Sequence, residues 1–308
     1  MPPRRKAAAA PTAEPTAEPT PSSSETTTTS PPSSTDWYLL HARMLEINDP
    51  QIWRQILVPP DITAQDLRWL MTAAFGWAGG HMCMWTVRKV TSIEGKSEPL
   101  VTEINPEGFA IPMAAFGYGD ANQDPDADFS AFDEDGNSNH GLKDKQTLAE
   151  LDKQYDFTNN KHLLHWEYDM GDSWEHIIMV EKRMSEAEVR ESGALAGGAK
   201  KGVKRTSTGK EKEAEKAEIK LTPKILEGKG HGVAEDAGSY PGWDDLKDAY
   251  KAKGTMKDNE EYESRRDWYE DSCGNGDPKG LKGKKRLEHF DVNEANAAWT
   301  MYKETWIR

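Results

Sequence analysis

The chain has 308 residues and a formal net charge of −14, with 53 acidic against 39 basic side chains. This acidity argues against a strongly basic nucleic-acid binder, although a local basic patch is compatible with it. The two cysteines, Cys83 and Cys273, predict neither a disulfide framework nor a zinc knuckle. No stretch approaches the roughly 18 apolar residues of a membrane span, and no secretory signal is evident. We therefore expect an intracellular protein, cytoplasmic or nuclear, that does not bind membranes.

Residues 1–35 contain no Leu, Ile, Val or aromatic side chain and are mostly Pro, Thr, Ser, Ala and Glu. Such a segment buries too little apolar surface to offset the entropy of ordering it. We predict a disordered tail over residues 1–35, followed by a single domain over residues 36–306.

The first part of this domain predicts a hairpin followed by a helix. Residues 38–45 and 52–58 have strand composition on either side of Asn48-Asp49-Pro50, which is typical of a turn. A helix is then predicted from the cap Thr63 to Gly76, because apolar residues recur on one helical face. These residues are Leu67, Leu70, Met71, Ala74 and Phe75.

Residues 82–90 predict a third strand, and an acidic loop follows over residues 117–141. An EF-hand loop needs Gly at its sixth position, but that position is Phe129 when counted from Asp124 and Ser138 when counted from Asp133. We therefore interpret the acids of this loop as solvated rather than as a calcium site.

The later part of the domain predicts a second hairpin and then helices. A short helix over residues 147–154 precedes strands over residues 162–169 and 174–181. Residues 185–220 lack apolar periodicity and read as a flexible insertion. Three helices follow, one carrying Trp243, Leu246 and Tyr250, one over residues 258–270, and one carrying Ala295, Ala298, Trp299, Tyr302 and Trp306.

Antiparallel hairpins with a packing helix, followed by a helical C-terminal third, predict an α+β fold with a β-grasp-like core.

Three ordered clusters resemble a known family. They are Pro50-x-Ile52-Trp53-Arg54 with Val58-Pro59, Phe75-Gly76-Trp77 with His81, and Tyr168-Asp169-x-Gly171-Asp172-x-Trp174-x-His176. In this order they are similar to the domain family named after the third open reading frame of an agrobacterial Ri plasmid. A late Glu235-Asp236-x-Gly238 element fits as well, whereas residues 228–234 replace the cysteine-containing stretch of the family.

The resemblance implies a fold rather than a reaction. Some relatives are labelled transposon resolvases or insertion-element passenger proteins. A serine recombinase needs an activated Ser beside an Arg cluster, and no such constellation surrounds Ser92, Ser97 or Ser173.

Carboxylates and an imidazole gather around the second hairpin. Asp169, Asp172 and His176 lie within one short segment, and Glu235 and Asp236 join them if the late segment packs beside the hairpin. Such a set binds a divalent metal or performs acid–base chemistry. The alternative interpretation is structural, because an Asp hydrogen-bonds the backbone of a turn and an aromatic residue packs on the sheet.

Other candidates line the predicted hairpins. Trp53 and Arg54 point to opposite faces of a strand. We expect Trp53 in the core and Arg54 paired with Asp169 or Asp172, or alternatively holding an anion. Candidate pocket-lining residues are Trp53, Trp77, His81 and Trp174.

Because no complete catalytic constellation is present, the leading hypothesis is a non-enzymatic module that binds a protein or a nucleic acid through a sheet face and the Gly171-Asp172 hairpin. One alternative is a metal-dependent hydrolase or phosphodiesterase that uses the Asp169, Asp172 and His176 hairpin. A second alternative is a scaffold whose tails carry the function. No cofactor is predicted, apart from the divalent metal that the hydrolase hypothesis requires.

Overall fold

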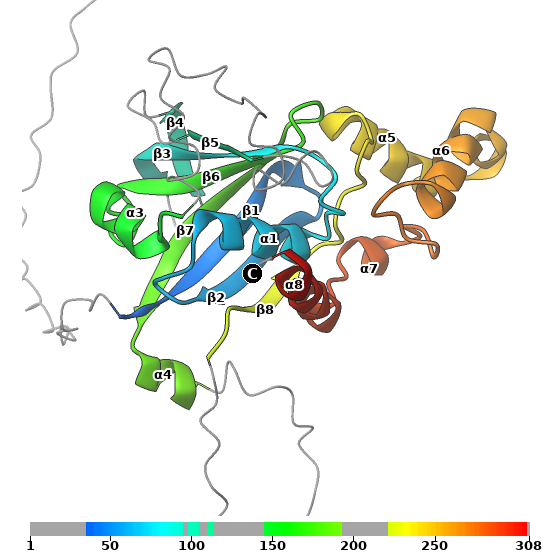
Figure 1. Ribbon diagram of the computed structural model, residues 1–308. Helices are drawn as coiled ribbons and strands as arrows, with labels where there is room; N and C mark the ends of the chain where they lie inside the picture. The colour runs from blue at the N-terminus through cyan, green and yellow to red at the C-terminus, as the bar shows by residue number, and fades with distance from the viewer. Residues whose placement is uncertain (1–34, 95–97, 105–109, 114–144, 193–220, 307–308) are drawn as a thin grey trace, which may run out of the picture. The chain divides into compact units, whose positions relative to one another are not determined.

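The computed structural model describes residues 35–94, 98–104, 110–113, 145–192 and 221–306. Within them an eight-stranded sheet runs in the order β4-β3-β6-β7-β1-β2-β8, with β5 paired to β3 (Figure 1). Every ladder is antiparallel. The strands are β1 (Trp37–Asn48), β2 (Gln51–Val58), β3 (Cys83–Glu94), β4 (Glu98–Ile104), β5 (Ala110–Met113), β6 (His162–Tyr168), β7 (Trp174–Met184) and β8 (Lys224–Lys229).

The helices follow the hairpins in the chain. They are α1 (Ala64–Phe75), α3 (Leu148–Tyr155), α4 (Glu186–Glu191), α5 (Ser239–Lys251), α6 (Glu260–Asp271), α7 (Lys284–Leu287) and α8 (Val292–Trp306), with a 3₁₀ turn at Gly254–Asp258. The predicted α+β class is confirmed, and the C-terminal third is helical after β8. No described helix has the length and apolar character needed to cross a membrane.

Helix α1 begins and ends where its sequence predicts. The Thr63 side chain accepts a hydrogen bond from the backbone N–H of Asp66, which satisfies one of the free donors of the first turn. Gly76 ends the helix with φ 75°, in the left-handed region that glycine enters without a steric penalty.

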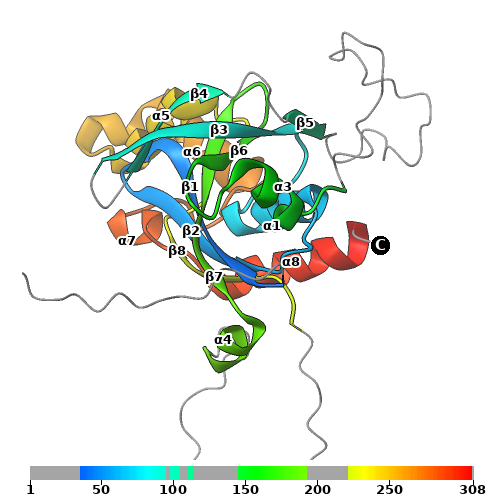
Figure 2. The same cartoon turned by 90° about the vertical axis from the view of Figure 1, so that its left-hand side faces the viewer.

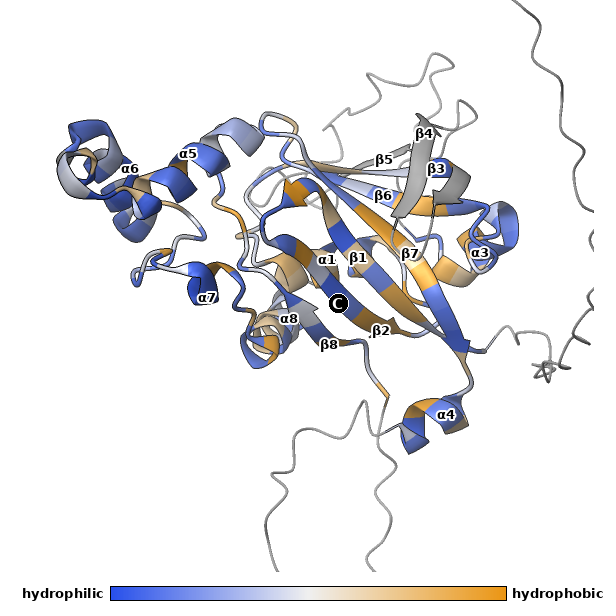
Figure 3. Cartoon of the chain, turned by 180° about the vertical axis from the view of Figure 1, so that it is seen from behind, coloured by the Kyte–Doolittle hydropathy of each residue, from blue (hydrophilic) through white to orange (hydrophobic). Residues whose placement is uncertain are grey.

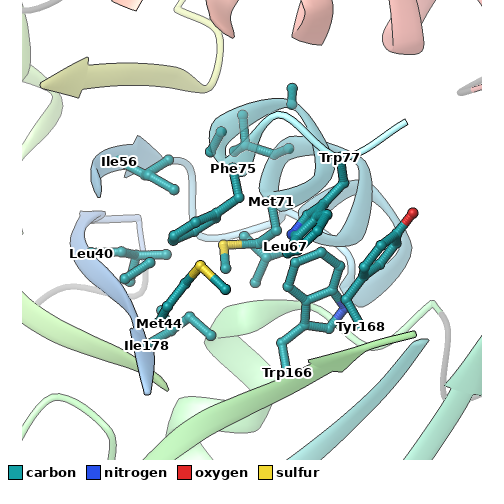
Figure 4. Packing of buried hydrophobic residues seen from close by; sticks show 14 of the residues in the cluster. Leu40, Met44, Ile56, Leu67, Met71, Phe75, Trp77, Trp166, Tyr168 and Ile178 are labelled. Carbon is teal, nitrogen blue, oxygen red and sulfur yellow. The ribbon is translucent and has the colours of Figure 1, made fainter. Parts of the chain in front are cut away.

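One face of the sheet holds the main core. Figures 1 and 2 show α1 and α8 on the same side of the strands. Figure 4 shows side chains of α1 packed against residues of β1, β2, β6 and β7. The labelled residues of this cluster are Leu40, Met44, Ile56, Leu67, Met71, Phe75, Trp77, Trp166, Tyr168 and Ile178.

The opposite face carries a mixture of polar and aromatic side chains. In Figure 3, seen from behind, β1, β2 and β7 face the viewer. Trp53 lies on this face and stacks on His41 with 5.4 Å between the ring centroids. Glu181 contacts both His41 and Gln55, at 3.3 Å and 2.7 Å. The β1–β2 hairpin therefore presents an aromatic and charged surface away from α1.

The orientation of β2 is the reverse of the one expected: Arg54, rather than Trp53, points into the core. Arg54 shares its face with Ile52 and Ile56, all three of which are buried, whereas Trp53 is half-buried on the other face. Alternate residues of a strand point to the same side, so these two isoleucines bring Arg54 into the core.

A side chain of α8 forms hydrogen bonds with the backbone of the edge strand β8. Asn296 accepts a hydrogen bond from the backbone N–H of Ile225 at 3.1 Å and donates one to the carbonyl of the same residue at 2.8 Å. These are the two groups through which Ile225 would otherwise pair with another strand.

Several elements differ from the sequence-based expectations. Strands β4, β5 and β8 were not predicted. The insertion expected over residues 185–220 begins with α4, where Ser185 and Glu188 form a capping box. The predicted tail, the acidic loop over residues 117–141 and most of the insertion lie outside the described residues.

Candidate functional site

Three of the motif segments meet at the end of the sheet that is farther from α4. They are the loop before β3, the β6–β7 hairpin, and the segment between β8 and α5. His81, Asp169 and Asp236 come from these segments in turn. Each has one side-chain nitrogen or oxygen atom that lies within 4.8 Å of such an atom in both of the others. We call these three residues the rim cluster.

The imidazole of His81 lies between the two carboxylates of the rim cluster. Its Nδ1 is 3.5 Å from Asp169 Oδ2, and its Nε2 is 3.4 Å from Asp236 Oδ1. The side chains differ in exposure, at 27% for His81, 9% for Asp169 and 65% for Asp236. The cluster therefore has a buried side at Asp169 and an open side at Asp236.

Asp169 is fixed by the turn that it begins. Its Oδ1 accepts hydrogen bonds from the backbone N–H groups of Gly171 at 2.9 Å and Asp172 at 3.4 Å. The residue has φ 61°, a left-handed conformation that Asp tolerates better than most side chains do. Its Oδ2 atom is left facing His81.

Asp172 joins the hairpin to the segment before α5. Its Oδ2 accepts a hydrogen bond from the backbone N–H of Gly238 at 3.1 Å. Asp236 has φ 58°, Gly238 has φ 88° and Ser239 has φ 65°, so three left-handed residues form the bend between Asp236 and α5. Asp172 thus supports the rim cluster without belonging to it.

Glu235 points inward, away from the direction taken by Asp236. Its Oε1 accepts hydrogen bonds from the Tyr168 hydroxyl at 2.6 Å and from the backbone N–H of Ala78 at 2.7 Å. The Tyr168 oxygen in turn accepts one from Gly79 N–H at 3.0 Å. Burial raises the pKa of the Glu235 carboxyl, and burial together with Glu235 raises the pKa of Tyr168. This network holds the loop that leads to His81.

His176 lies in the interior, apart from the rim cluster. Its exposed fraction is 0%, and the rings of Phe75 and Trp77 lie at 4.5 and 5.9 Å. Nδ1 donates to the carbonyl of Trp166 at 3.1 Å, and Nε2 accepts from the indole N–H of Trp77 at 3.4 Å. Burial lowers the pKa of His176 to about 3. A neutral ring with both nitrogens engaged fills a structural role.

Arg54 is likewise buried and makes its contacts with the backbone. Its guanidinium donates to the carbonyl oxygens of Ala74 at 2.5 Å, of Trp53 and Lys229 at 2.7 Å, and of Gly230 at 3.0 Å. The expected pairing with Asp169 or Asp172 does not occur, because Arg54 faces the core and donates to these four backbone carbonyls instead.

The packing around Arg54 depends on Gly228. A Cβ atom at that position would lie 2.7 Å from Arg54 Cδ and 2.9 Å from Phe290. The guanidinium also lies over the Phe290 ring, 3.8 Å from its centroid. Burial lowers the pKa of Arg54 to about 9.

The candidate pocket-lining residues take different places. Trp77 and Trp174 are buried in the core, with 5.9 Å between their ring centroids, and Trp53 lies on the other face of the sheet. His81 alone of the four belongs to the rim cluster.

The sequence analysis did not identify Asn275, which holds the segment around Glu235. Its Oδ1 accepts from Glu235 N–H at 2.8 Å, and its amide donates to the carbonyls of Gly76 and Val233.

The fold and the rim cluster thus define an α+β domain with a candidate metal-binding group at one end of its sheet. The chain belongs to the family of plasmid pRiA4b ORF-3-like proteins, whose sequence model matches residues 37–209. The resemblance found in the motifs is confirmed. The matched region contains His81 and Asp169, whereas Asp236 lies beyond it.

Among solved structures, the chain is similar to a crystal structure of a protein of unknown function from Methanosarcina mazei Go1. The two share 22% identity, with a TM-score of 0.44, over 84% of this chain and 96% of that one. No curated protein matches the chain.

Proposed function

We propose that this protein is a divalent-cation-binding domain and that the cation binds at the rim cluster. The observation that carries the proposal is the approach of one imidazole and two carboxylates from three separate segments to within 4.8 Å. Ligand sets of this kind, with nitrogen and oxygen donors, suit Mn²⁺, Fe²⁺ or Zn²⁺ better than Mg²⁺ or Ca²⁺, which prefer oxygen alone.

The surroundings of the rim cluster support this proposal. Two of its three residues, Asp169 and Asp236, have left-handed backbones, and an ordinary side chain in that region costs about 1–3 kcal/mol. The hydrogen bonds of Glu235 and Asp172 hold the segments on either side in place. A cation would offset the repulsion between two carboxylates that flank one ring.

The proposal is limited to binding. The hydrolase hypothesis uses the Asp169, Asp172 and His176 hairpin, with Glu235 and Asp236 beside it. His176, however, is enclosed by aromatic rings, and Glu235 accepts hydrogen bonds from Tyr168 and Ala78. A hydrolytic role would have to rest on other groups.

Thermal unfolding of the full chain with Mn²⁺ or Zn²⁺ tests the proposal. At about 100 times its dissociation constant, a cation adds about 2.7 kcal/mol, or about 5–10 °C in Tm for a domain of this size. His81→Gln and Asp236→Asn should remove the shift. Asp248→Asn is the matched control, because it neutralises an exposed acid of α5 that makes no contact with the cluster, and it should keep the shift. A wild-type protein with no shift, or a shift that persists in both rim variants, contradicts the proposal.

A second candidate function is the interaction module, which the outer face of the sheet favours. Trp53 and His41 stack there beside Glu181, so an aromatic surface with charged edges faces away from α1 and α8. Aromatic side chains of this kind anchor protein and nucleic-acid partners. A partner that binds the wild type and Asp236→Asn equally but fails to bind Trp53→Ser would support this function. A partner that is indifferent to Trp53→Ser would exclude this face as its binding surface.

A further inference from the structure

The two carboxylates of the rim cluster approach different nitrogens of the same ring. Asp169 Oδ2 lies 3.5 Å from His81 Nδ1, and Asp236 Oδ1 lies 3.4 Å from Nε2. A cation takes one nitrogen of a neutral imidazole, and the hydrogen on the other nitrogen then needs an acceptor. One carboxylate can therefore orient the ring while the other shares the cation with it.

Asp169 has the properties of the orienting carboxylate. It is only 9% exposed, and its Oδ1 is occupied by the backbone N–H groups of Gly171 and Asp172. Only Oδ2 is directed toward the ring. A buried charge interacts more strongly with a nearby N–H than an exposed one does, because water screens it less. The neutral ring should therefore keep its hydrogen on Nδ1, beside Asp169.

Asp236 has the properties of a ligand. Its side chain is 65% exposed and lies next to Nε2, the nitrogen that is left without a hydrogen in this tautomer. Because Asp236 is exposed, a cation held between its carboxylate and Nε2 would be accessible to solvent.

We propose that His81 Nε2 and the Asp236 carboxylate bind the cation, and that Asp169 is a positioning residue that holds the hydrogen on His81 Nδ1. This assignment rests on the proposed cation-binding function and adds the division of labour among the three residues. Because two protein atoms fill a small part of the coordination sphere, water or the oxygens of a bound anion complete it.

The first test reads the tautomer of His81 in the metal-free full chain. With ¹⁵N-labelled histidine, the chain gives signals from 8 rings, and the His81→Gln variant identifies the signal of His81. In the neutral ring of the wild type we expect the hydrogen on Nδ1. Asp169→Asn keeps an acceptor for the turn and tolerates the left-handed backbone, but it can place an amide N–H against Nδ1. The hydrogen should then move to Nε2. A wild-type ring protonated on Nε2, or no change in Asp169→Asn, overturns the assignment.

The second test measures binding of Mn²⁺ and Zn²⁺ by calorimetry. Asp236→Asn should abolish binding, Asp169→Asn should weaken it about 10–100-fold, and Asp248→Asn, at an exposed acid of α5, should leave it unchanged. Zn²⁺ that binds Nδ1 instead of Nε2, as read from the ¹⁵N shifts, overturns this assignment and leaves the proposed function standing. A wild-type protein that binds neither cation overturns both.

Discussion

Two histidines in this domain have opposite surroundings. His176 is enclosed by aromatic rings, and each of its nitrogens has one neutral hydrogen-bond partner. His81 is partly exposed, and each of its nitrogens faces a carboxylate. The first arrangement favours a permanently neutral ring that fixes the packing, and the second favours binding of a cation. The sequence gives both residues the same chemical type, so their partners and burial distinguish their roles.

The largest effect is expected where the interior loses a charge. Arg54→Met leaves the carbonyls of Ala74, Lys229 and Gly230 without their donor, so we expect a loss of about 3–5 kcal/mol in the free energy of unfolding. Urea unfolding followed by tryptophan fluorescence measures it. Lys284→Met, which removes an exposed cation, should change stability by less than about 0.5 kcal/mol. Equal effects of the two variants would show that Arg54 does not hold the core.

A pH series sharpens the comparison between the two histidines. Below pH 6.5 the unfolded chain protonates His176, whereas the folded chain protonates it only near its pKa of about 3. Stability should therefore fall as the pH falls from 6.5, by about 2 kcal/mol at pH 5 from this residue alone. His176→Gln should be less stable at neutral pH and should lose this part of the slope. Parallel pH profiles for wild type and His176→Gln would contradict the buried neutral ring.

The network that joins the interior to the rim should show an intermediate effect. Tyr168→Phe removes the donor to Glu235 and the acceptor of Gly79 N–H, so we expect a loss of about 1–3 kcal/mol. A double-mutant cycle with Glu235→Gln measures the coupling between the two side chains. Tyr262→Phe, on the largely exposed helix α6, is the control and should change stability little. Strict additivity in the cycle would mean that the 2.6 Å contact contributes nothing.

The smallest effect on stability is expected at the rim itself. Asp236 has φ 58°, so Asp236→Gly removes steric strain and should raise stability by up to about 1 kcal/mol, whereas Asp236→Ala should lower it. Both variants should lose the cation-dependent shift in Tm. Thermal unfolding with and without Mn²⁺ measures both quantities. If Asp236→Gly is markedly less stable than the wild type, the Asp236 side chain stabilises the fold.

Much of the fold could be predicted from local patterns. The spacing of apolar residues and the caps at Thr63 and Gly76 predict α1, and the turn at residues 170–173 predicts the β6–β7 hairpin. Strand β8 could not be predicted in this way, because its only apolar side chains are Ile225 and Leu226 and it forms by pairing with β2. Its strand structure depends on tertiary contacts rather than on its own propensity.

The direction in which the Arg54 side chain points could have been predicted from the sequence. Ile52 and Ile56 flank it at strand spacing, so all three residues must share a side. Hydrophobicity alone favours Trp53 as the residue that points into the core. It does not reveal that four backbone carbonyl oxygens accept hydrogen bonds from the buried guanidinium of Arg54.

The rim cluster was only partly accessible from the sequence. Asp169 and Asp236 were candidates for one site, but His176 was the imidazole assigned to them. The partner that the fold supplies is His81, from a segment that no local pattern connects to the hairpin. Which of several histidines reaches a given pair of acids depends on the order of strands in the sheet, and the sequence motifs do not state that order.

Asn296 has a consequence for the protein at high concentration. An open sheet edge is a template on which a second chain can extend the sheet, and fibres grow by repeating that step. At Ile225 the amide of Asn296 occupies both backbone groups that such a step requires. One side chain of α8 thus makes polymerisation through β8 at Ile225 begin with the breaking of two hydrogen bonds, which opposes that step.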